Sequence, residues 1–165
     1  MYRIGQRVMY GIHGVCQIVD ITVRSVGKEK VQCYVLEPAE HPETRYYIPS
    51  GKPAAVAKIR PVLTRQELDA LLREELSPEQ VWIPDENQRK NKYRELLVGG
   101  DHRSLLAMLQ ALAEHKKKQE DIGRKFHLCD ENFLREAQRL LASEFCLVLE
   151  MSVQDTAKYI MDAID

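Results

Sequence analysis

The strongest constraint on the fold of this chain is a pair of strand-like runs near its N-terminus, separated by four residues of which two are glycine. The runs cover residues 7–10 and 15–21 and are rich in β-branched and aromatic side chains, a composition that favours strands. Gly11 and Gly14 supply the positive φ angles that a tight reversal needs. The segment is therefore predicted to form a β-hairpin, and one face of its second strand is predicted to carry Val15, Gln17, Val19 and Ile21.

The hydrophobic pattern changes its period near residue 60. Before this point, further strand-like runs cover residues 31–37, 44–49 and 56–60, with turn-forming residues between them. Short strands in such close succession are typical of a small SH3-like or Tudor-like barrel. From Thr64 onward the pattern is helical, so we predict an α+β protein with a small β-barrel at residues 1–60 and an all-α helical bundle at residues 61–165.

Capping residues mark the helix boundaries of the second half. Residues 64–67 form a capping-box motif, and Ser-Pro at 77–78 suits the start of a short helix. We expect the later helices to begin after Asp85, Asp101, Asp130 and Ser152. Their expected ends are the pair Gly99-Gly100, Gly123 and Leu149. Apolar residues recur at helical spacing within 105–112 and 133–149, which predicts a compact bundle with these side chains in its core.

Composition argues against several classes of function. The four cysteines form no Cys-x-x-Cys motif and the five histidines lie in no recognisable nucleophile or metal-binding motif, so no catalytic residue, metal or cofactor is expected. An enzyme that uses His13 or Cys16 is the alternative, and it requires a pocket with an activated cysteine. No window reaches the about 20 consecutive apolar residues of a membrane span. With no secretory signal at the start, we expect a cytoplasmic protein without a membrane partner.

Two features of the helical half suggest a binding role. Trp82, the only tryptophan, stands at a helix junction, where its side chain can wedge into a minor groove or fill the space between helices. A basic helix follows, with Arg89, Lys90, Lys92 and Arg94. Their spacing spreads the charges around the helix, so they contact phosphates in part or simply face solvent. A later basic run, at residues 116–118 and 124–125, is diluted by acidic neighbours and ranks below them.

Taken in order, these motifs resemble the CarD/CdnL family of bacterial transcription regulators. The resemblance rests on Gly5, Val8, Tyr10, His13-Gly14, Tyr34, Leu36, Ile48-Pro49, Arg60-Pro61 and the run ELLVGGD at residues 95–101. It implies a Tudor-like N-terminal domain, shared with the transcription-repair coupling factor, that docks on the RNA polymerase β subunit by pairing sheet edges. It also implies a helical domain that contacts promoter DNA at the upstream edge of the transcription bubble, with weak sequence specificity, and modulates open-complex stability.

The resemblance also assigns polymerase contacts by position. Arg24, placed just after the second predicted strand, matches a polymerase-contacting arginine of the family. Tyr47 stands where the family often has a second arginine, and Arg45, two residues earlier on the same strand face, is expected to serve instead. Trp82 and the basic helix from Arg89 match the DNA-contacting region, with an offset of roughly one helical turn between them.

Two further expectations concern partners. The alternative function is a protein adaptor that docks on polymerase or another partner without touching DNA, and burial of both Trp82 and Arg89 would favour it. An exposed edge strand could also support a homodimer by strand pairing or swapping in the absence of polymerase.

Overall fold

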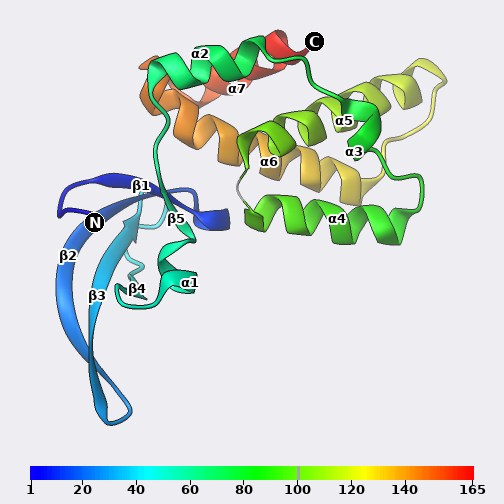
Figure 1. The fold of residues 1–165 in the computed structure, drawn as a ribbon. Coiled ribbons are helices and arrows are strands. Elements are labelled where there is room, and N and C mark those ends of the chain that lie inside the picture. The colour runs from blue at the N-terminus through cyan, green and yellow to red at the C-terminus, as the bar shows by residue number, and fades with distance from the viewer. Residues whose placement is uncertain (100) are drawn as a thin grey trace. The chain divides into compact units, whose positions relative to one another are not determined.

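The computed structural model describes residues 1–99 and 101–165, and the chain divides into two units, Met1–Val62 and Leu63–Asp165. Each unit has its own hydrophobic core. Figure 1 shows the strands of the first unit and the helices that make up the second. The expected order, a β-rich part followed by a helical part, is confirmed.

A five-stranded antiparallel sheet organises the first unit. Its elements are β1 (Arg7–Tyr10), the 3-10 turn η1 (Gly11–His13), β2 (Val15–Val26), β3 (Glu29–Pro38), β4 (Tyr46–Pro49), α1 (Pro53–Val56) and β5 (Ile59–Pro61). The hydrogen-bonded order is β4-β3-β2-β1-β5, so β4 and β5 form the two edges of the sheet. Closure of a barrel requires such edges to pair, and the predicted barrel is therefore not confirmed. The last strand begins at Ile59 and not at Val56 as predicted, because the helical turn that starts at Pro53 includes Val56.

The core of this unit lies on one face of the sheet, and a β-bulge decides which side chains of β2 reach it. The pairing moves from Ile18 to Asp20 on β2 while β3 advances by a single residue, so Val19 is an extra residue. Beyond this bulge, Ile21 packs against the same core as Ile18. The bulge reverses the alternation of side chains, and the prediction that Ile21 shares a face with Val15, Gln17 and Val19 is wrong.

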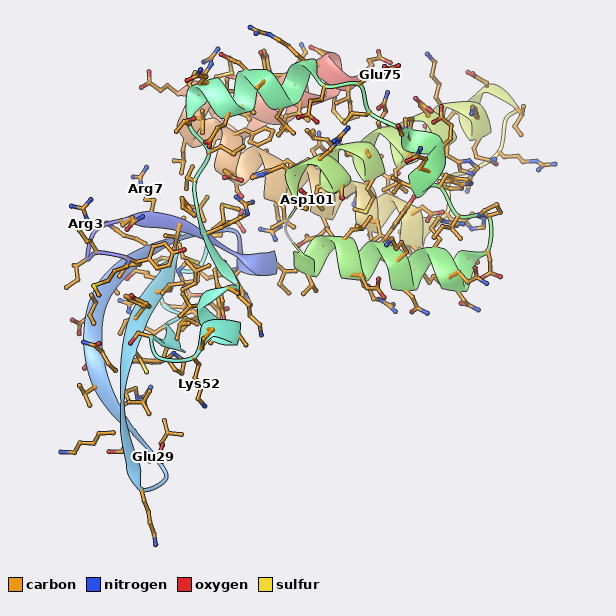
Figure 2. The ribbon with its side chains drawn as sticks, viewed as in Figure 1. Arg3, Arg7, Glu29, Lys52, Glu75 and Asp101 are labelled. Carbon is orange, nitrogen blue, oxygen red and sulfur yellow. The ribbon has the colours of Figure 1, made fainter. Side chains whose placement is uncertain are left out.

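Strands β2 and β3 extend beyond their neighbours and form a two-stranded arm. β1 pairs with β2 only as far as Gln17, and β4 pairs with β3 only from Cys33 onward. β2 and β3 remain paired as far as Val26 and Glu29, and Figure 2 labels Glu29 at the free end of this arm. The second strand was predicted to end at residue 21, so Arg24 lies within β2 and not after it.

The second unit consists of helices joined by short connections. Its elements are α2 (Arg65–Arg73), α3 (Pro78–Val81), α4 (Glu86–Gly99), α5 (His102–Asp121), α6 (Leu128–Leu149) and α7 (Val153–Ile164). The predicted capping box is confirmed: the Thr64 hydroxyl accepts from the Glu67 amide and the Glu67 carboxylate accepts from the Thr64 amide. Asp101 and Ser152 also cap their helices as predicted. Of the predicted stop Gly99-Gly100, Gly99 ends α4, and the second glycine lies outside the described residues.

The start of α6 differs from the prediction. The helix begins at Leu128, with His127 in the capping position, and not after Asp130. Asp130 lies within the first helical turn, where its side chain is buried. Aspartate is common at helix starts, but a buried carboxylate requires a partner in the tertiary structure. That partner is Arg89 of α4, which donates to both carboxylate oxygens of Asp130.

The predicted core of the helical bundle is confirmed. α6 contacts both α5 and α7, and Figure 1 shows these three helices together in the second unit. The buried side chains include Leu105, Met108, Leu109, Leu112, Phe133, Leu134, Ala137, Leu140, Leu141, Phe145 and Leu149. Within residues 1–99 and 101–165, no helix is both long and apolar enough to cross a lipid bilayer.

Candidate functional site

Arg24 and Tyr47, predicted as parts of one binding surface, lie together on the first unit. The guanidinium carbon of Arg24, on β2, lies 3.9 Å from the centroid of the Tyr47 ring, on β4, within range of a cation–π interaction. Their partners in the sheet, Val31 and Val35, are an even number of residues apart on β3, so all four side chains share one face. Arg24 and Tyr47 are both exposed. The fold therefore brings these two residues together across β3.

This face of the sheet also carries apolar side chains. Cys33 and Val35 alternate with the core-facing residues of β3 and are buried, although they lie outside the core cluster of the unit. Val26, two residues after Arg24 on the same face of β2, is 55% exposed. We call the surface formed by Arg24, Val26, Val35 and Tyr47 the outer face. It combines a cation, an aromatic ring and exposed apolar area.

Arg45 occupies a different position from the one predicted. It immediately precedes β4 and does not lie within it. Its side chain contacts both the loop before the strand and β3. Its guanidinium pairs with Glu37 at 2.7 Å and donates to the carbonyls of Pro42 and Thr44 at 2.7 and 3.1 Å. Arg45 is exposed, so these contacts are open to water and contribute little to stability.

Trp82 lies at the end of α3 and is partly buried against the helical core. Its indole stacks on the imidazole of His115, from α5, with ring centroids 3.8 Å apart and planes at 23°. The guanidinium carbon of Arg89, from α4, lies 4.5 Å from the indole centroid. The tryptophan is therefore held by two side chains from different helices, and its own side chain is neither fully exposed nor fully buried.

Arg89 is buried, with 4% of its surface exposed. Its Nε and Nη2 atoms donate to the two carboxylate oxygens of Asp130 at 2.9 and 2.8 Å, and Nη1 donates to the carbonyls of Ile83 and Pro84 at 2.8 and 3.2 Å. Burial opposes the charge, but the hydrogen bonds and the negative charge of Asp130 outweigh it and raise the pKa of Arg89. All three guanidinium nitrogens are used inside the protein. The structure therefore gives Arg89 a different role from the predicted phosphate contact.

The other cations of the predicted basic helix point in different directions. Lys90 and Arg94 lie four residues apart, on one side of α4, whereas Lys92 lies on another side. Lys92 and Arg94 are exposed, and Lys90 pairs with Glu86 at 2.7 Å. Arg89 takes the inward side of the helix. A single nucleic-acid backbone can thus meet Lys90 with Arg94, or Lys92, but not all of them at once.

A groove beside Trp82 is lined in part by Lys118, a residue of the basic run that we ranked below the basic helix from Arg89. The groove has a volume of about 250 Å³, and its lining includes Trp82, His115 and Lys118. Phe126, preceded by two basic residues, has its ring 6.2 Å from that of His115. Lys118 is exposed. Part of the later basic run therefore lies beside the tryptophan. Sequence reasoning missed this because the proximity depends on how α5 packs against α3.

Tyr93, the next inward residue of α4 after Arg89, has an unusual hydroxyl. The side chain is fully buried, and within residues 1–99 and 101–165 its Oη atom has no hydrogen-bond partner. Burial raises the pKa of this phenol. We expect Tyr93→Phe to change the free energy of unfolding by less than about 1 kcal/mol, because removal of an unpaired buried hydroxyl also removes its desolvation cost. Urea denaturation followed by circular dichroism measures this, and a loss above that size would mean that the hydroxyl has a partner in solution.

His13 and Cys16, the residues of the enzyme alternative, both make contacts that are typical of structural residues. Cys16 is fully buried, and burial raises the pKa of its thiol to about 12, so the reactive thiolate is scarce at neutral pH. The Nδ1 atom of His13 lies 2.9 Å from the Tyr46 hydroxyl, and its ring stacks on Tyr10. Within the described part of the chain, no three histidine, cysteine or acidic side chains gather as a metal site would require.

Comparison with known proteins gives a match for the first unit. A family model described as CarD-like/TRCF RID domain matches residues 2–63. No curated protein matches the chain significantly. The matched segment ends next to the boundary between the two units.

Proposed function

Because residues 2–63 belong to the CarD-like/TRCF RID domain family, whose domains are non-catalytic modules that interact with RNA polymerase, we propose that the chain is a bacterial transcription regulator that binds the polymerase β subunit through its first unit. The match confirms the resemblance to CarD/CdnL proteins for residues 2–63, and the resemblance of the helical unit stays a prediction. We further propose that the helical unit contacts promoter DNA at the upstream edge of the transcription bubble and modulates open-complex stability. A cytoplasmic, nucleoid-associated location follows from this proposal.

The outer face is the observation that carries the polymerase half of the proposal. Its arginine and tyrosine are residue types that are enriched at protein interfaces, and Arg24 is the residue that the family resemblance assigns to polymerase. Next to it, β4 leaves a free strand edge, which a partner strand can extend. Arg45 is held by an exposed ion pair with Glu37, so a carboxylate on the partner can replace Glu37 at small cost.

The surroundings of Trp82 support the DNA half of the proposal. A fixed, partly exposed indole can press against bases and sugars in a minor groove, and Lys90, Lys92 and Arg94 supply cations for phosphates. Lys118, in the groove beside the indole, adds another. Such contacts give salt-dependent affinity with weak sequence specificity. Arg89 enters the proposal only as a residue that holds Trp82 in place.

An adaptor that binds polymerase without touching DNA is the second candidate. Arg89 is buried, as that alternative expects, whereas Trp82 is only partly buried. The burial of Arg89 removes one predicted phosphate contact and favours the adaptor to that extent. The partial exposure of the indole, together with Lys118 beside it, favours DNA contact.

A homodimer by strand pairing or swapping remains a prediction. The free edges at β4 and β5 support it, because unpaired backbone groups on an edge invite another strand. Analytical ultracentrifugation of the chain, alone and with the β subunit, tests it: a dimer that dissociates on binding is expected, and a monomer at all concentrations would contradict it.

Replacement of Trp82 separates the two functions. We expect Trp82→Ala to retain polymerase binding but to shorten the open-complex lifetime by about tenfold, because an aromatic contact to a base contributes about 1–3 kcal/mol. The measurement is the decay of promoter complexes after addition of a competitor. Val81→Ala, at the neighbouring partly buried residue, controls for local destabilisation. If polymerase binding and lifetime both stay at the wild-type level, the adaptor is the better description, and absence of polymerase binding by the wild-type chain would refute the central claim.

A further inference from the structure

The segment that carries Trp82 is anchored to two other helices through one arginine. Arg89 donates to the carbonyls of Ile83 and Pro84, the two residues that follow the tryptophan. Through Asp130 the same guanidinium is tied to α6. Since Arg89 also lies against the indole, a single buried side chain fixes both the backbone after Trp82 and the ring itself.

His115 contributes the closest aromatic contact of the indole. A centroid separation of 3.8 Å with nearly parallel planes is direct stacking. The imidazole is partly buried, and the ring of Phe126 is a second aromatic neighbour, with its centroid 6.2 Å away. The area of the indole that His115 covers cannot stack on a base while this contact persists. Insertion between two bases needs both faces of an aromatic ring, so the contact limits how Trp82 can engage nucleic acid.

We propose that His115 is a positioning residue for Trp82, which together with the Arg89–Asp130 pair holds the indole in one orientation and leaves its edge to contact the nucleic acid. This inference rests on the proposed function. It narrows the DNA contact to a wedge against base and sugar edges in a groove and excludes full intercalation of the ring between two base pairs. His115 acts through Trp82 and needs no contact of its own with DNA.

Burial, assisted by nearby cations, lowers the pKa of His115 and favours its neutral imidazole. Burial lowers the pKa of His115 from its usual value of 6.5, the charge of Asp130 raises it, and the nearby cations lower it further. The facing groups are Asp130 from α6, Arg89 from α4, Lys118 and Glu114 on α5, Glu79 from α3, and His127 before α6. At pH 7 the neutral ring therefore predominates, and the midpoint of its protonation lies below pH 6.5. A protonated imidazole quenches the fluorescence of a stacked indole, so the contact has a signature of its own.

Trp82 is the only tryptophan, so the tryptophan fluorescence of the full chain reports on the surroundings of this one side chain. We expect His115→Gln to lower the population of the stacked orientation by about two- to tenfold, seen as greater quenching by acrylamide. In the wild type we expect fluorescence to fall as the pH drops below 6.5 and His115 takes up a proton. We expect His115→Gln to abolish this loss. His115→Phe keeps an aromatic ring without a titrating proton, so it should restore low acrylamide quenching but not the pH transition. His127→Gln, at the exposed neighbouring histidine, is the matched control and should resemble the wild type.

The outcomes distinguish this inference from the proposed function. Unchanged quenching and an unchanged pH transition in His115→Gln would overturn the positioning role, even if Trp82→Ala shortens the open-complex lifetime. Increased quenching in His115→Gln, restored by His115→Phe, supports the positioning role, even if the lifetime does not respond to Trp82→Ala and the DNA half of the proposed function fails. If both hold, the lifetime should shorten in His115→Gln and recover in His115→Phe. Failure of that recovery would overturn positioning as the reason for the effect.

Discussion

Replacement of Asp130 by alanine is expected to lower the free energy of unfolding of the helical unit by about 3–5 kcal/mol. The carboxylate accepts two hydrogen bonds from Arg89, and both side chains are almost fully buried. Without it, the guanidinium keeps its charge in a site shielded from water, and two of its donors lose their partners. Urea denaturation of the full chain measures the loss by circular dichroism, and the emission of Trp82 reports whether the neighbouring segment is released at the same time.

Two further variants make the Asp130 experiment specific. Glu86→Ala breaks the ion pair between Glu86 and Lys90, which lies on α4 and is open to solvent. This variant should lower the free energy of unfolding far less. The double variant Arg89→Met with Asp130→Leu replaces the buried pair by apolar side chains and should recover much of the lost stability, because neither charge is left unpaired. If Asp130→Ala were no more destabilising than Glu86→Ala, the buried pair would not hold α4 to α6 in solution.

Arg24→Glu is expected to weaken binding to the polymerase β subunit at least about tenfold, because it removes a cation from the outer face and puts a like charge before any carboxylate on the partner. The stability of the first unit should change little, because Arg24 is exposed and its contact with Tyr47 lies at the surface. Biolayer interferometry with the immobilised β subunit and the full chain measures the affinity.

A charge-matched variant is the control for Arg24. Lys28→Glu makes the same change of charge at an exposed position in the turn at the end of the arm. We expect it to bind the β subunit nearly as well as the wild type. Equal losses in the two variants would indicate a response to net charge alone, and no loss in Arg24→Glu would remove the outer face from the binding surface.

Local patterns in the sequence were reliable where the structure depends on neighbours in the chain. The turn with its two glycines, the capping box from Thr64 and the cap at Ser152 involve residues at most four positions apart, and each is found in the structure. The buried stripes of α5 and α6 follow in the same way, because helical spacing alone decides which residues share a face.

Predictions failed where a distant contact overrides a local preference. Asp130 has the residue type of a helix cap, yet its carboxylate pairs with Arg89, which lies forty-one residues earlier. Arg89 has the residue type of a phosphate contact, yet that same pair buries it. The extra residue Val19 interrupts the alternation of β2, and an alternating pattern contains no signal for such a bulge.

The sequence by itself determined the division into a β-rich and a helical part, most helix boundaries, and the resemblance that connects the first unit with RNA polymerase. These depend on residue types and short spacings, which the chain carries in every conformation. Only the tertiary structure decided that the sheet has two open edges, that Arg24 and Tyr47 meet across β3, and that Arg89 and His115 hold Trp82. The physical reason is that burial and pairing belong to side chains from separate elements, and their energies are set only when those elements pack together.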